Sequence, residues 1–127
     1  MSQFTSLKPI LYTRALTDTV KFYTEVLGFV CLAFEEAWGW ASLVKDDVEL
    51  MFSSPNEHIP FDAPLFTGSF YIVTDKVDEL WDAYKDKCKV CYEPESFDYE
   101  MREFAIYDNN GYLLQFGQEI KQENENI

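Results

Sequence analysis

The sequence predicts an α+β fold in which a βαβββ module occurs twice. The first observation is an apolar periodicity that switches between the two-residue period of strands and the 3.6-residue period of helices. The second is the order of the segments, strand, helix and three strands, which recurs about 60 residues further along the chain. We expect a single domain over residues 1–120, built from halves at about 5–54 and 68–118. The two modules are expected to form a half-open curved sheet whose inner face is a ligand site.

The first module opens with a strand over residues 7–13, in which Pro9 indicates a sheet edge or a position exchanged between subunits. A helix follows, for which Thr17 or Asp18 is the expected cap and Gly28 the end. Three more strands are predicted, the last two joined by a two-residue turn at Asp46-Asp47. Their expected ranges are residues 29–34, 38–44 and 48–53.

The second module follows residues 54–67, a proline-rich segment without strand or helix period that we interpret as a long ordered loop or a lid. A strand over residues 69–74 leads into a helix capped by Asp75, with an apolar stripe at helical spacing. The hairpin turn is expected at Asn110-Gly111, with positive backbone angles. The remaining strands are expected over residues 88–92, 101–107 and 112–117, and residues 121–127 as a flexible tail.

The charge balance narrows the function classes. Ten basic and twenty-three acidic residues give a net charge of −13, which repels phosphate backbones and argues against nucleic-acid binding. The same field attracts cations, although acidity also serves solubility alone. No apolar run approaches the roughly 20 residues that span a bilayer. With three cysteines and no secretory signal pattern at the start, we expect a cytoplasmic protein with reduced thiols.

Three segments then follow one another along the chain: PILYTRALTDTVKFYTEVLGF, LVKDDVELMFSSP and REFAIYDNNGYLLQFGQ. Together they resemble the vicinal-oxygen-chelate superfamily of glyoxalases, bleomycin-resistance proteins and dioxygenases, and most nearly its bleomycin-resistance proteins. The resemblance covers about residues 7–118. It implies a homodimer that sequesters cationic glycopeptide antibiotics of the bleomycin class, chemically unaltered, in two crevices at the subunit interface. An N-terminal arm crosses between subunits in such proteins.

The same resemblance allows a test for metal. Metal-dependent members carry His, Glu or Gln at inward positions, which correspond here to Lys8, Glu49 or its neighbours, Ser69 and Gln115. A protonated lysine has no lone pair and serine is a poor ligand, whereas an open catalytic site needs about three protein ligands. The only histidine, His58, lies in the proline-rich loop. We therefore expect no metal, no cofactor and no catalytic residue, with Gln115 as a hydrogen-bonding amide of the pocket.

The cysteines do not change this expectation. Cys88 and Cys91 have a CxxC spacing, but residues three apart on a strand point to opposite faces. No histidine is placed to activate a nucleophile. The sequence therefore predicts a binding protein and no enzyme.

Aromatic and polar residues at the expected inner positions form the predicted ligand site. Trp38 and Trp40 are expected on one face of a strand, and Tyr99 lies just before the position where the resistance proteins tend to carry a Trp. Flat rings of a cationic ligand would stack on the aromatic side chains, and its ammonium groups would meet acids and ring faces. The predicted ligand-binding residues are Trp38, Trp40, Glu49, Met51, Ser53, Ser69, Tyr71, Tyr99, Glu103 and Gln115.

Two alternatives stay open from sequence alone. One is a metal-dependent lyase, isomerase or dioxygenase of the same superfamily, with a displaced metal site built from Glu49, Gln115 and His58. The other is a non-catalytic binding protein for another small molecule or for a partner protein.

Overall fold

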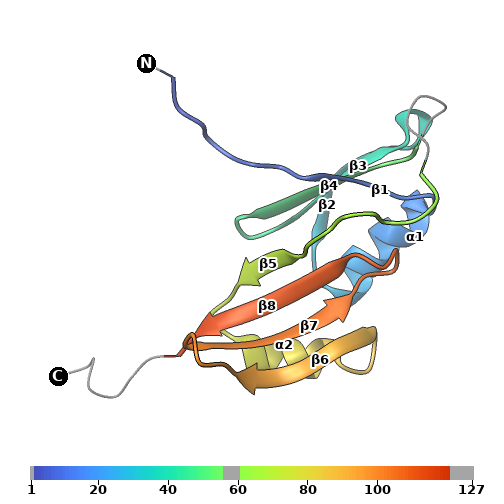
Figure 1. Ribbon diagram of the computed structural model, residues 1–127. Coiled ribbons are helices and arrows are strands. Elements are labelled where there is room, and N and C mark those ends of the chain that lie inside the picture. The colour runs from blue at the N-terminus through green and yellow to red at the C-terminus, as the bar shows by residue number, and fades with distance from the viewer. Residues whose placement is uncertain (1, 56–60, 121–127) are drawn as a thin grey trace. The chain divides into compact units, whose positions relative to one another are not determined.

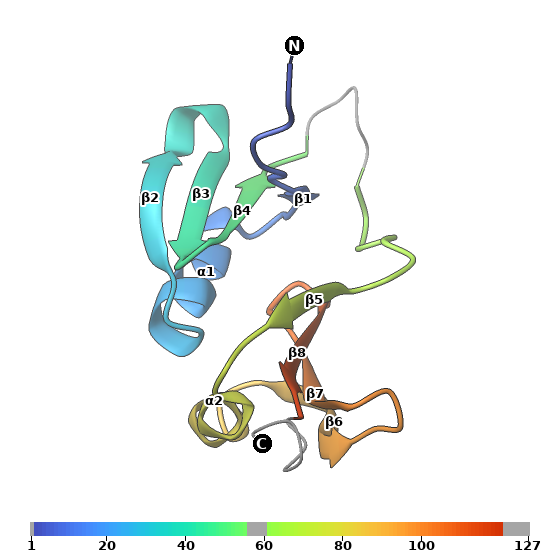
Figure 2. The same ribbon diagram turned by 90° about the vertical axis from the view of Figure 1, so that its left-hand side faces the viewer.

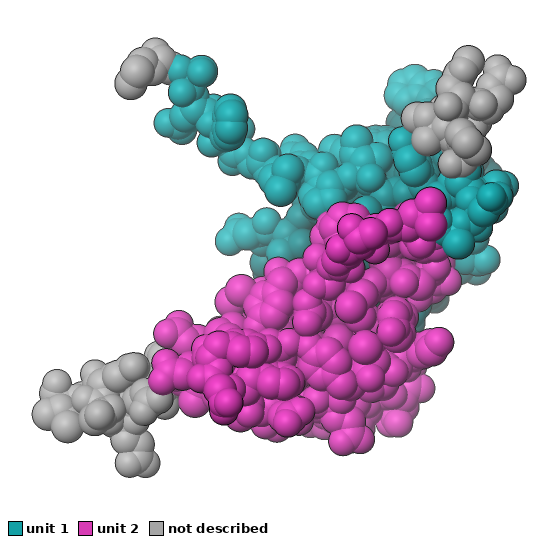
Figure 3. Space-filling view, viewed as in Figure 1, with its two compact units in different colours: residues 1–63 teal, residues 64–127 magenta. Residues whose placement is uncertain are grey.

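The computed structural model describes residues 2–55 and 61–120. The chain separates into two compact units, unit 1 (residues 1–63) and unit 2 (residues 64–127), coloured separately in Figure 3. Each unit contains one four-stranded mixed sheet and one main helix, in the order strand, helix, strand, strand, strand (Figure 1). The predicted α+β fold with a duplicated βαβββ module is therefore confirmed. That the two halves form one domain stays a prediction.

The sheet of unit 1 has the strand order β1-β4-β3-β2, with β1 parallel to β4 and the other pairs antiparallel. The helix α1 (Leu16–Lys21) continues as a π-helical turn, η1 (Phe22–Val26). Gly28, at φ +83°, follows the helix as predicted, since this left-handed conformation suits glycine. The strands are β1 (Ile10–Tyr12), β2 (Val30–Glu35), β3 (Trp40–Lys45) and β4 (Val48–Ser53).

The core of unit 1 lies between this helix and one face of its sheet. Tyr23 is fully buried, and its ring lies 5.3 Å from that of Phe29 and 5.0 Å from that of Phe52. Ala41, Leu43 and Leu50 are buried on the strands beside it. Full burial of a side chain of this size stabilises a fold by ~1.5–3 kcal/mol. The alternating residues of β3 and β4 therefore face away from the helix.

The sheet of unit 2 has the strand order β5-β8-β7-β6, with β5 parallel to β8. One face packs on α2 (Val77–Tyr84), which lies beside the sheet in Figure 2. The rings of Trp81 and Tyr84 lie 5.4 and 6.4 Å from that of Phe104 on β7. The opposite face of this sheet, which we call the open face of unit 2, carries the alternate residues. The strands are β5 (Phe70–Val73), β6 (Lys89–Ser96), β7 (Met101–Tyr107) and β8 (Leu113–Glu119).

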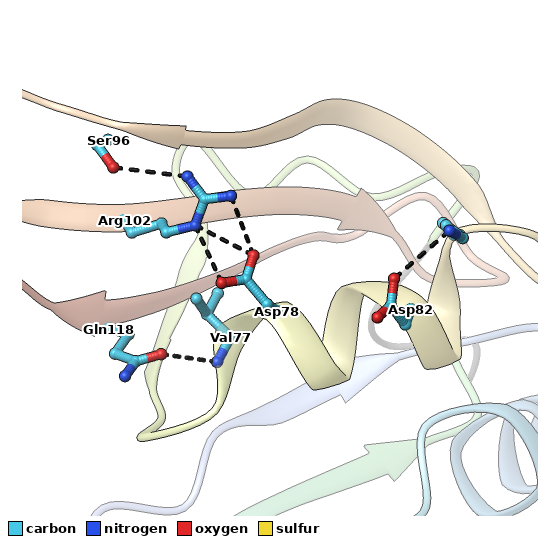
Figure 4. A network of polar contacts seen from close by, with 7 residues as sticks. Val77, Asp78, Asp82, Ser96, Arg102 and Gln118 are labelled. Atoms are coloured by element: carbon cyan, nitrogen blue, oxygen red, sulfur yellow. Dashed lines mark hydrogen bonds and ion pairs between the residues drawn. The ribbon is translucent and has the colours of Figure 1, made fainter.

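The predicted helix caps are wrong. Thr17 and Asp18 lie inside α1, and the residues at the cap positions, Ala15 and Lys76, make no side-chain cap bond. The first N–H of α2, that of Val77, is instead bonded by the side-chain oxygen of Gln118 on β8, at 2.9 Å (Figure 4). Because β8 is distant in sequence from α2, no residue pattern near the start of the helix indicates this cap.

The predicted hairpin turn is present, but its backbone angles differ from those expected. Gly111 has φ +100°, but Asn110 is not among the residues of positive φ, because the turn is organised by Asp108. The Oδ1 atom of Asp108 accepts the N–H groups of Asn110, Gly111 and Tyr112 at 2.8–2.9 Å. The predicted loop over residues 54–67 has neither helix nor strand where it is described. His58 and the predicted tail over residues 121–127 lie outside the described residues.

No helix in the described ranges is long and apolar enough to cross a membrane. The three described cysteines are free, and Cys88 and Cys91 have separate partners. The thiol of Cys88 donates to the Tyr84 carbonyl at 3.1 Å, whereas that of Cys91 accepts from the Tyr107 hydroxyl at 3.5 Å. Cys88 lies before β6, so the expectation that one strand holds both cysteines is wrong, and that the two thiols do not converge stays a prediction.

Candidate functional site

The open face of unit 2 carries a buried carboxylate, that of Glu103 on β7. Its residue is only 2% exposed, although it lies on the face without a helix. In the sheet register Glu103 stands opposite Gly117 of β8 on one side and Glu95 of β6 on the other. Strands therefore flank it on both sides, and side chains from the same face cover it.

Three tyrosines and one amide donate hydrogen bonds to this carboxylate. The hydroxyls of Tyr71 and Tyr99 donate to Oε1 at 3.0 and 2.6 Å. Oε2 accepts the hydroxyl of Tyr92 and the side-chain Nε2 of Gln115, the latter at 3.3 Å. A carboxylate has about four lone-pair sites, so this one is saturated by neutral donors. We call Glu103 with these four residues the tyrosine cage.

The amide of Gln115 is held at both ends. Its Nε2 also donates to the Tyr92 hydroxyl oxygen at 2.8 Å, and its Oε1 accepts the hydroxyl of Ser69. A carboxylate at position 115 would place a like charge beside Glu103 and donate nothing to it. The neutral amide is thus the side chain that fits both neighbours.

Gly117 explains how Tyr71 reaches Glu103. Tyr71 is on the edge strand β5, and Glu103 lies two strands away, across β8. A side-chain Cβ at position 117 would lie 2.1 Å from the Tyr71 hydroxyl oxygen and 2.6 Å from its Cζ. Real Cβ atoms do not approach other atoms so closely, so only glycine lets the tyrosine lie across β8.

The cage holds the carboxylate in its charged form. Burial alone would raise the pKa of Glu103, but the hydrogen bonds from Tyr92, Tyr99, Tyr71 and Gln115 outweigh it and hold that pKa below the usual value. In return, burial and the bond to Glu103 raise the pKa of Tyr71 to about 12. The bond to Glu103, followed by burial, likewise raises the pKa of Tyr99 to about 12. At neutral pH the carboxylate is ionised and the phenols keep their protons.

No positive side chain balances this charge within the part of the chain that the structure describes. No lysine or arginine there forms an ion pair with Glu103. Its neighbour Arg102 points to the other face of the sheet, where its Nε lies 3.1 and 3.2 Å from the two carboxylate oxygens of Asp78 on α2 (Figure 4). Arg102 is thus paired with an acid of the helix. Among the described residues, the Glu103 carboxylate is thus a negative charge without a paired cation, surrounded by three phenol rings.

Glu49 in unit 1 is placed differently. Its Oε2 accepts the hydroxyl of Ser42 at 2.6 Å, and its Oε1 lies 3.5 Å from the ammonium of Lys8. The Ser42 bond, together with the charge of Lys8, outweighs burial and lowers the pKa of Glu49. This carboxylate therefore already has a cation.

The residues present do not fit the metal site of the superfamily. The bond from the Thr13 N–H to the Ser53 carbonyl (3.1 Å) corresponds to that from Thr74 to Gly117 (2.9 Å) in unit 2. When the two units are aligned on these bonds, Lys8 corresponds to Ser69 and Met51 corresponds to Gln115. Met51, close to Glu49 on β4, therefore occupies the fourth position that would hold a metal ligand. An ammonium, a thioether, a hydroxyl and an amide make a poor ligand set for Zn²⁺ or Ni²⁺. Residues 2–55 and 61–120 contain no group of three or more His, Cys, Asp or Glu that could hold a metal ion.

The structure brings together five of the ten predicted ligand-binding residues on the open face of unit 2. These are Ser69, Tyr71, Tyr99, Glu103 and Gln115. Four others share the face of the unit 1 sheet that lies opposite its helix, since the strand register aligns them there: Trp40, Glu49, Met51 and Ser53. Nine of the ten thus lie on these two faces, and that all ten contact a ligand stays a prediction.

Trp38 is the exception. It belongs to a short 3₁₀ turn, Glu36–Trp38, and β3 begins only at Trp40, after Gly39 with φ +62°. The prediction that Trp38 and Trp40 alternate along one strand is therefore wrong. The left-handed glycine breaks the extended backbone, and Trp38 is left 78% exposed.

Tyr92 is the cage residue that the sequence did not reveal. It lies on β6 opposite Ala105, between two register shifts in the β6–β7 pairing. Its position at the end of a predicted strand is visible in the sequence. Its alignment with Glu103 depends on those irregularities, which the residue pattern does not encode.

The comparisons with known proteins agree with the fold. The family model of the Glyoxalase/Bleomycin resistance protein/Dioxygenase superfamily matches residues 5–116. No curated protein sequence matches the chain significantly. Among solved structures, the chain is similar to a bleomycin resistance determinant encoded on the transposon Tn5, at 23% identity and a TM-score of 0.74, over 91% of this chain and 98% of that one.

Two further solved structures share the fold. TioX from Micromonospora sp. ML1 has 15% identity and a TM-score of 0.74, over 92% of this chain and all (100%) of that one. A glyoxalase/bleomycin resistance protein/dioxygenase from Nocardioides has 16% identity and a TM-score of 0.73, over 95% of this chain and 87% of that one. At these identities the likeness shows the fold alone.

Proposed function

The chain belongs to the glyoxalase/bleomycin resistance protein/dioxygenase superfamily, and we propose that it binds a cationic, aromatic small molecule without altering it. The observation that carries this proposal is the tyrosine cage: a buried, ionised Glu103 with four neutral donors and, among residues 2–55 and 61–120, no paired cation. A charge of this kind favours a ligand of opposite sign.

The surroundings of Glu103 add to that preference. A cation beside a phenol ring gains on the order of 1–2 kcal/mol when it is desolvated. The ring of Tyr99 stacks on that of Phe97, with centroids 5.4 Å apart and an interplanar angle of 2°, so the cage continues into an aromatic platform. The net charge of −13 raises the local concentration of cations near any such site.

The same residues argue against catalysis. A general base works best when its pKa lies near the working pH, but the pKa of Glu103 is held below its ordinary value and its oxygens are already occupied. The positions that bind metal in the superfamily's metal-dependent members carry lysine, methionine, serine and glutamine. We therefore propose that the protein binds its ligand and does not convert it.

We further propose that the ligand is an antibiotic of the bleomycin type, sequestered by a homodimer with pockets at the subunit interface. The resemblance to bleomycin-resistance proteins and the shared fold of the Tn5 determinant support this choice. In the proposed complex, flat heteroaromatic rings stack on aromatic side chains of the cage such as Tyr99, and the cationic groups approach Glu103. Resistance then follows from stoichiometric binding.

Titration with copper-free bleomycin, followed by tryptophan fluorescence, tests the proposal. We expect saturation at micromolar drug, equivalent to a binding free energy of roughly −8 kcal/mol, and recovery of the drug with unchanged mass. Sedimentation at micromolar protein should show a dimer. Absence of saturation would remove bleomycin from the proposal. Turnover abolished by a chelator, with about one metal ion per chain, would establish the enzymatic alternative.

A further inference from the structure

The four donors to Glu103 are not held equally. Tyr92 is half-buried and also accepts a bond from Gln115, which Ser69 holds in turn. Tyr71 lies across Gly117, which leaves room for its ring. Tyr92 and Gln115 are therefore each fixed by a second hydrogen bond, and Tyr71 lies over the backbone of β8.

Tyr99 is the most exposed of the four donors, and its second contact is the stacking of its ring on that of Phe97. It is 60% exposed and lies in the short connection between β6 and β7, outside the strands. In this connection the Glu100 N–H bonds to the Phe97 carbonyl at 3.0 Å, and Glu100 has φ +65°, a conformation that non-glycine residues seldom adopt. The hydroxyl of Tyr99 therefore reaches Glu103 from a strained turn at the edge of the cage.

We infer that Tyr99 is a displaceable donor, which a ligand's primary ammonium or guanidinium group replaces at Oε1 of Glu103. The other three donors keep the carboxylate in place. This inference rests on the proposed function and narrows its ligand class. The cation must carry N–H groups, because a quaternary ammonium cannot donate the hydrogen bond that Tyr99 gives up.

The exchange is favourable for two reasons. A hydrogen bond between two charged groups is stronger than one between a phenol and a carboxylate, so Oε1 gains by it. The Tyr99 hydroxyl returns to water at little cost, because the residue is already largely exposed. Without ligand, Tyr99 covers a carboxylate that is otherwise expensive to bury unpaired. The ring remains beside the site and offers its face to the cation.

The test uses n-butylammonium as a probe, with tetramethylammonium as the cation without N–H groups. Protein with ¹³C-labelled tyrosine rings gives one signal for each residue, and the Tyr99 signal is assigned by its loss in Tyr99→Phe. We expect n-butylammonium to move the Tyr99 signal saturably and tetramethylammonium to leave it unmoved. Equal movement with both probes, or none with n-butylammonium, overturns the inference.

The affinity of Tyr99→Phe distinguishes the two possible roles of the Tyr99 hydroxyl, because they predict opposite changes. If the hydroxyl competes with the ligand, Tyr99→Phe tightens n-butylammonium binding by roughly 3- to 10-fold, whereas a ligand-contacting hydroxyl would make it weaker. Glu103→Gln should weaken binding by at least about 10-fold. Tyr107→Phe is the matched control: it removes a hydroxyl on β7 that contacts Cys91 and should change nothing. Weaker binding in Tyr99→Phe overturns the inference, even if Glu103→Gln proves unfolded.

Different experimental outcomes overturn the inference about Tyr99 and the proposed function. Displacement of Tyr99 by n-butylammonium, with no binding of bleomycin, supports the inference and removes only the antibiotic. Saturable binding of bleomycin that leaves the Tyr99 signal unmoved overturns the inference and keeps the proposed function.

Discussion

Replacing Gly117 by alanine should release Tyr71 from the tyrosine cage. The new methyl carbon would lie 2.1, 2.6 and 2.9 Å from the hydroxyl oxygen, Cζ and Cε1 of Tyr71, so one of the two must move. Position 117 is buried on a strand between two others, whereas Tyr71 is 41% exposed on the edge strand. The tyrosine ring is therefore expected to swing outward, away from Glu103.

The cost follows from two opposing contributions. A hydrogen bond to a charged group contributes ~1.5–3 kcal/mol, and we take the lower end because Tyr71 is partly in water. Alanine in place of a strand glycine returns ~0.5–1 kcal/mol. The variant should therefore lose about 1 kcal/mol of unfolding free energy, which lowers the Tm of a chain of this size by about 4 °C.

Two assays check this prediction, thermal unfolding by circular dichroism and tyrosine titration by ultraviolet absorbance. Because folding raises the pKa of Tyr71 from 10 to about 12, its contribution to stability is complete below pH 10 and is lost as the pH rises towards 12. In Gly117→Ala that loss should disappear, and one tyrosine should ionise nearer pH 10.

A second background controls for other effects of the methyl group. In Tyr71→Ala protein no ring lies over position 117, so Gly117→Ala should stabilise by ~0.5–1 kcal/mol. If the glycine substitution destabilised both backgrounds equally, or left the Tyr71 titration unchanged, the assigned role of Gly117 would be wrong.

Three further substitutions test other contacts of unit 2. Because folding lowers the pKa of Glu103, this residue stabilises the fold above pH 4.5, and that stabilisation is lost as the pH falls through the pKa of the folded state. Urea unfolding from pH 7 to 3 should therefore show that Glu103→Gln loses less stability in acid than the wild-type protein. Gln115→Glu puts a second carboxylate beside the first and should cost roughly 2 kcal/mol at pH 7, with stability recovering at lower pH as the pair takes up a proton; an unchanged pH profile would contradict this. Gln118→Ala removes the bond to the Val77 N–H at the start of α2 and should cost about 1 kcal/mol, measured by urea unfolding against Glu119→Ala, an exposed neighbour that should cost nothing.

The local pattern predicted the elements better than their ends. The strands over residues 48–53 and 101–107 have the predicted bounds. The first strand is shorter than predicted, Ile10–Tyr12, and the strand predicted over residues 88–92 extends to Ser96. Pairing with a neighbour fixes these ends, and the neighbour is distant in sequence.

The cage could be predicted only in part. Ser69 and Gln115 are two of the four positions expected to match the metal ligands of the superfamily, and they bond to each other. The contact of Tyr71 with Glu103 passes over Gly117, and so depends on the order β5-β8-β7 as well as on a missing side chain. No single segment contains that information. Of the five predicted residues that converge on unit 2, Tyr71, Glu103 and Gln115 lie on strands, whose alternation sorts them to one face. Strand order and register decide which of them touch.

The most direct measurement is the affinity of copper-free bleomycin for Glu103→Gln, beside wild-type protein and Glu119→Gln. Both variants lose one negative charge, but only Glu103→Gln loses it inside the tyrosine cage. We predict a loss of at least about 10-fold for Glu103→Gln and under about twofold for Glu119→Gln. Equal affinities in all three proteins would contradict an uncompensated carboxylate as the group that selects the ligand.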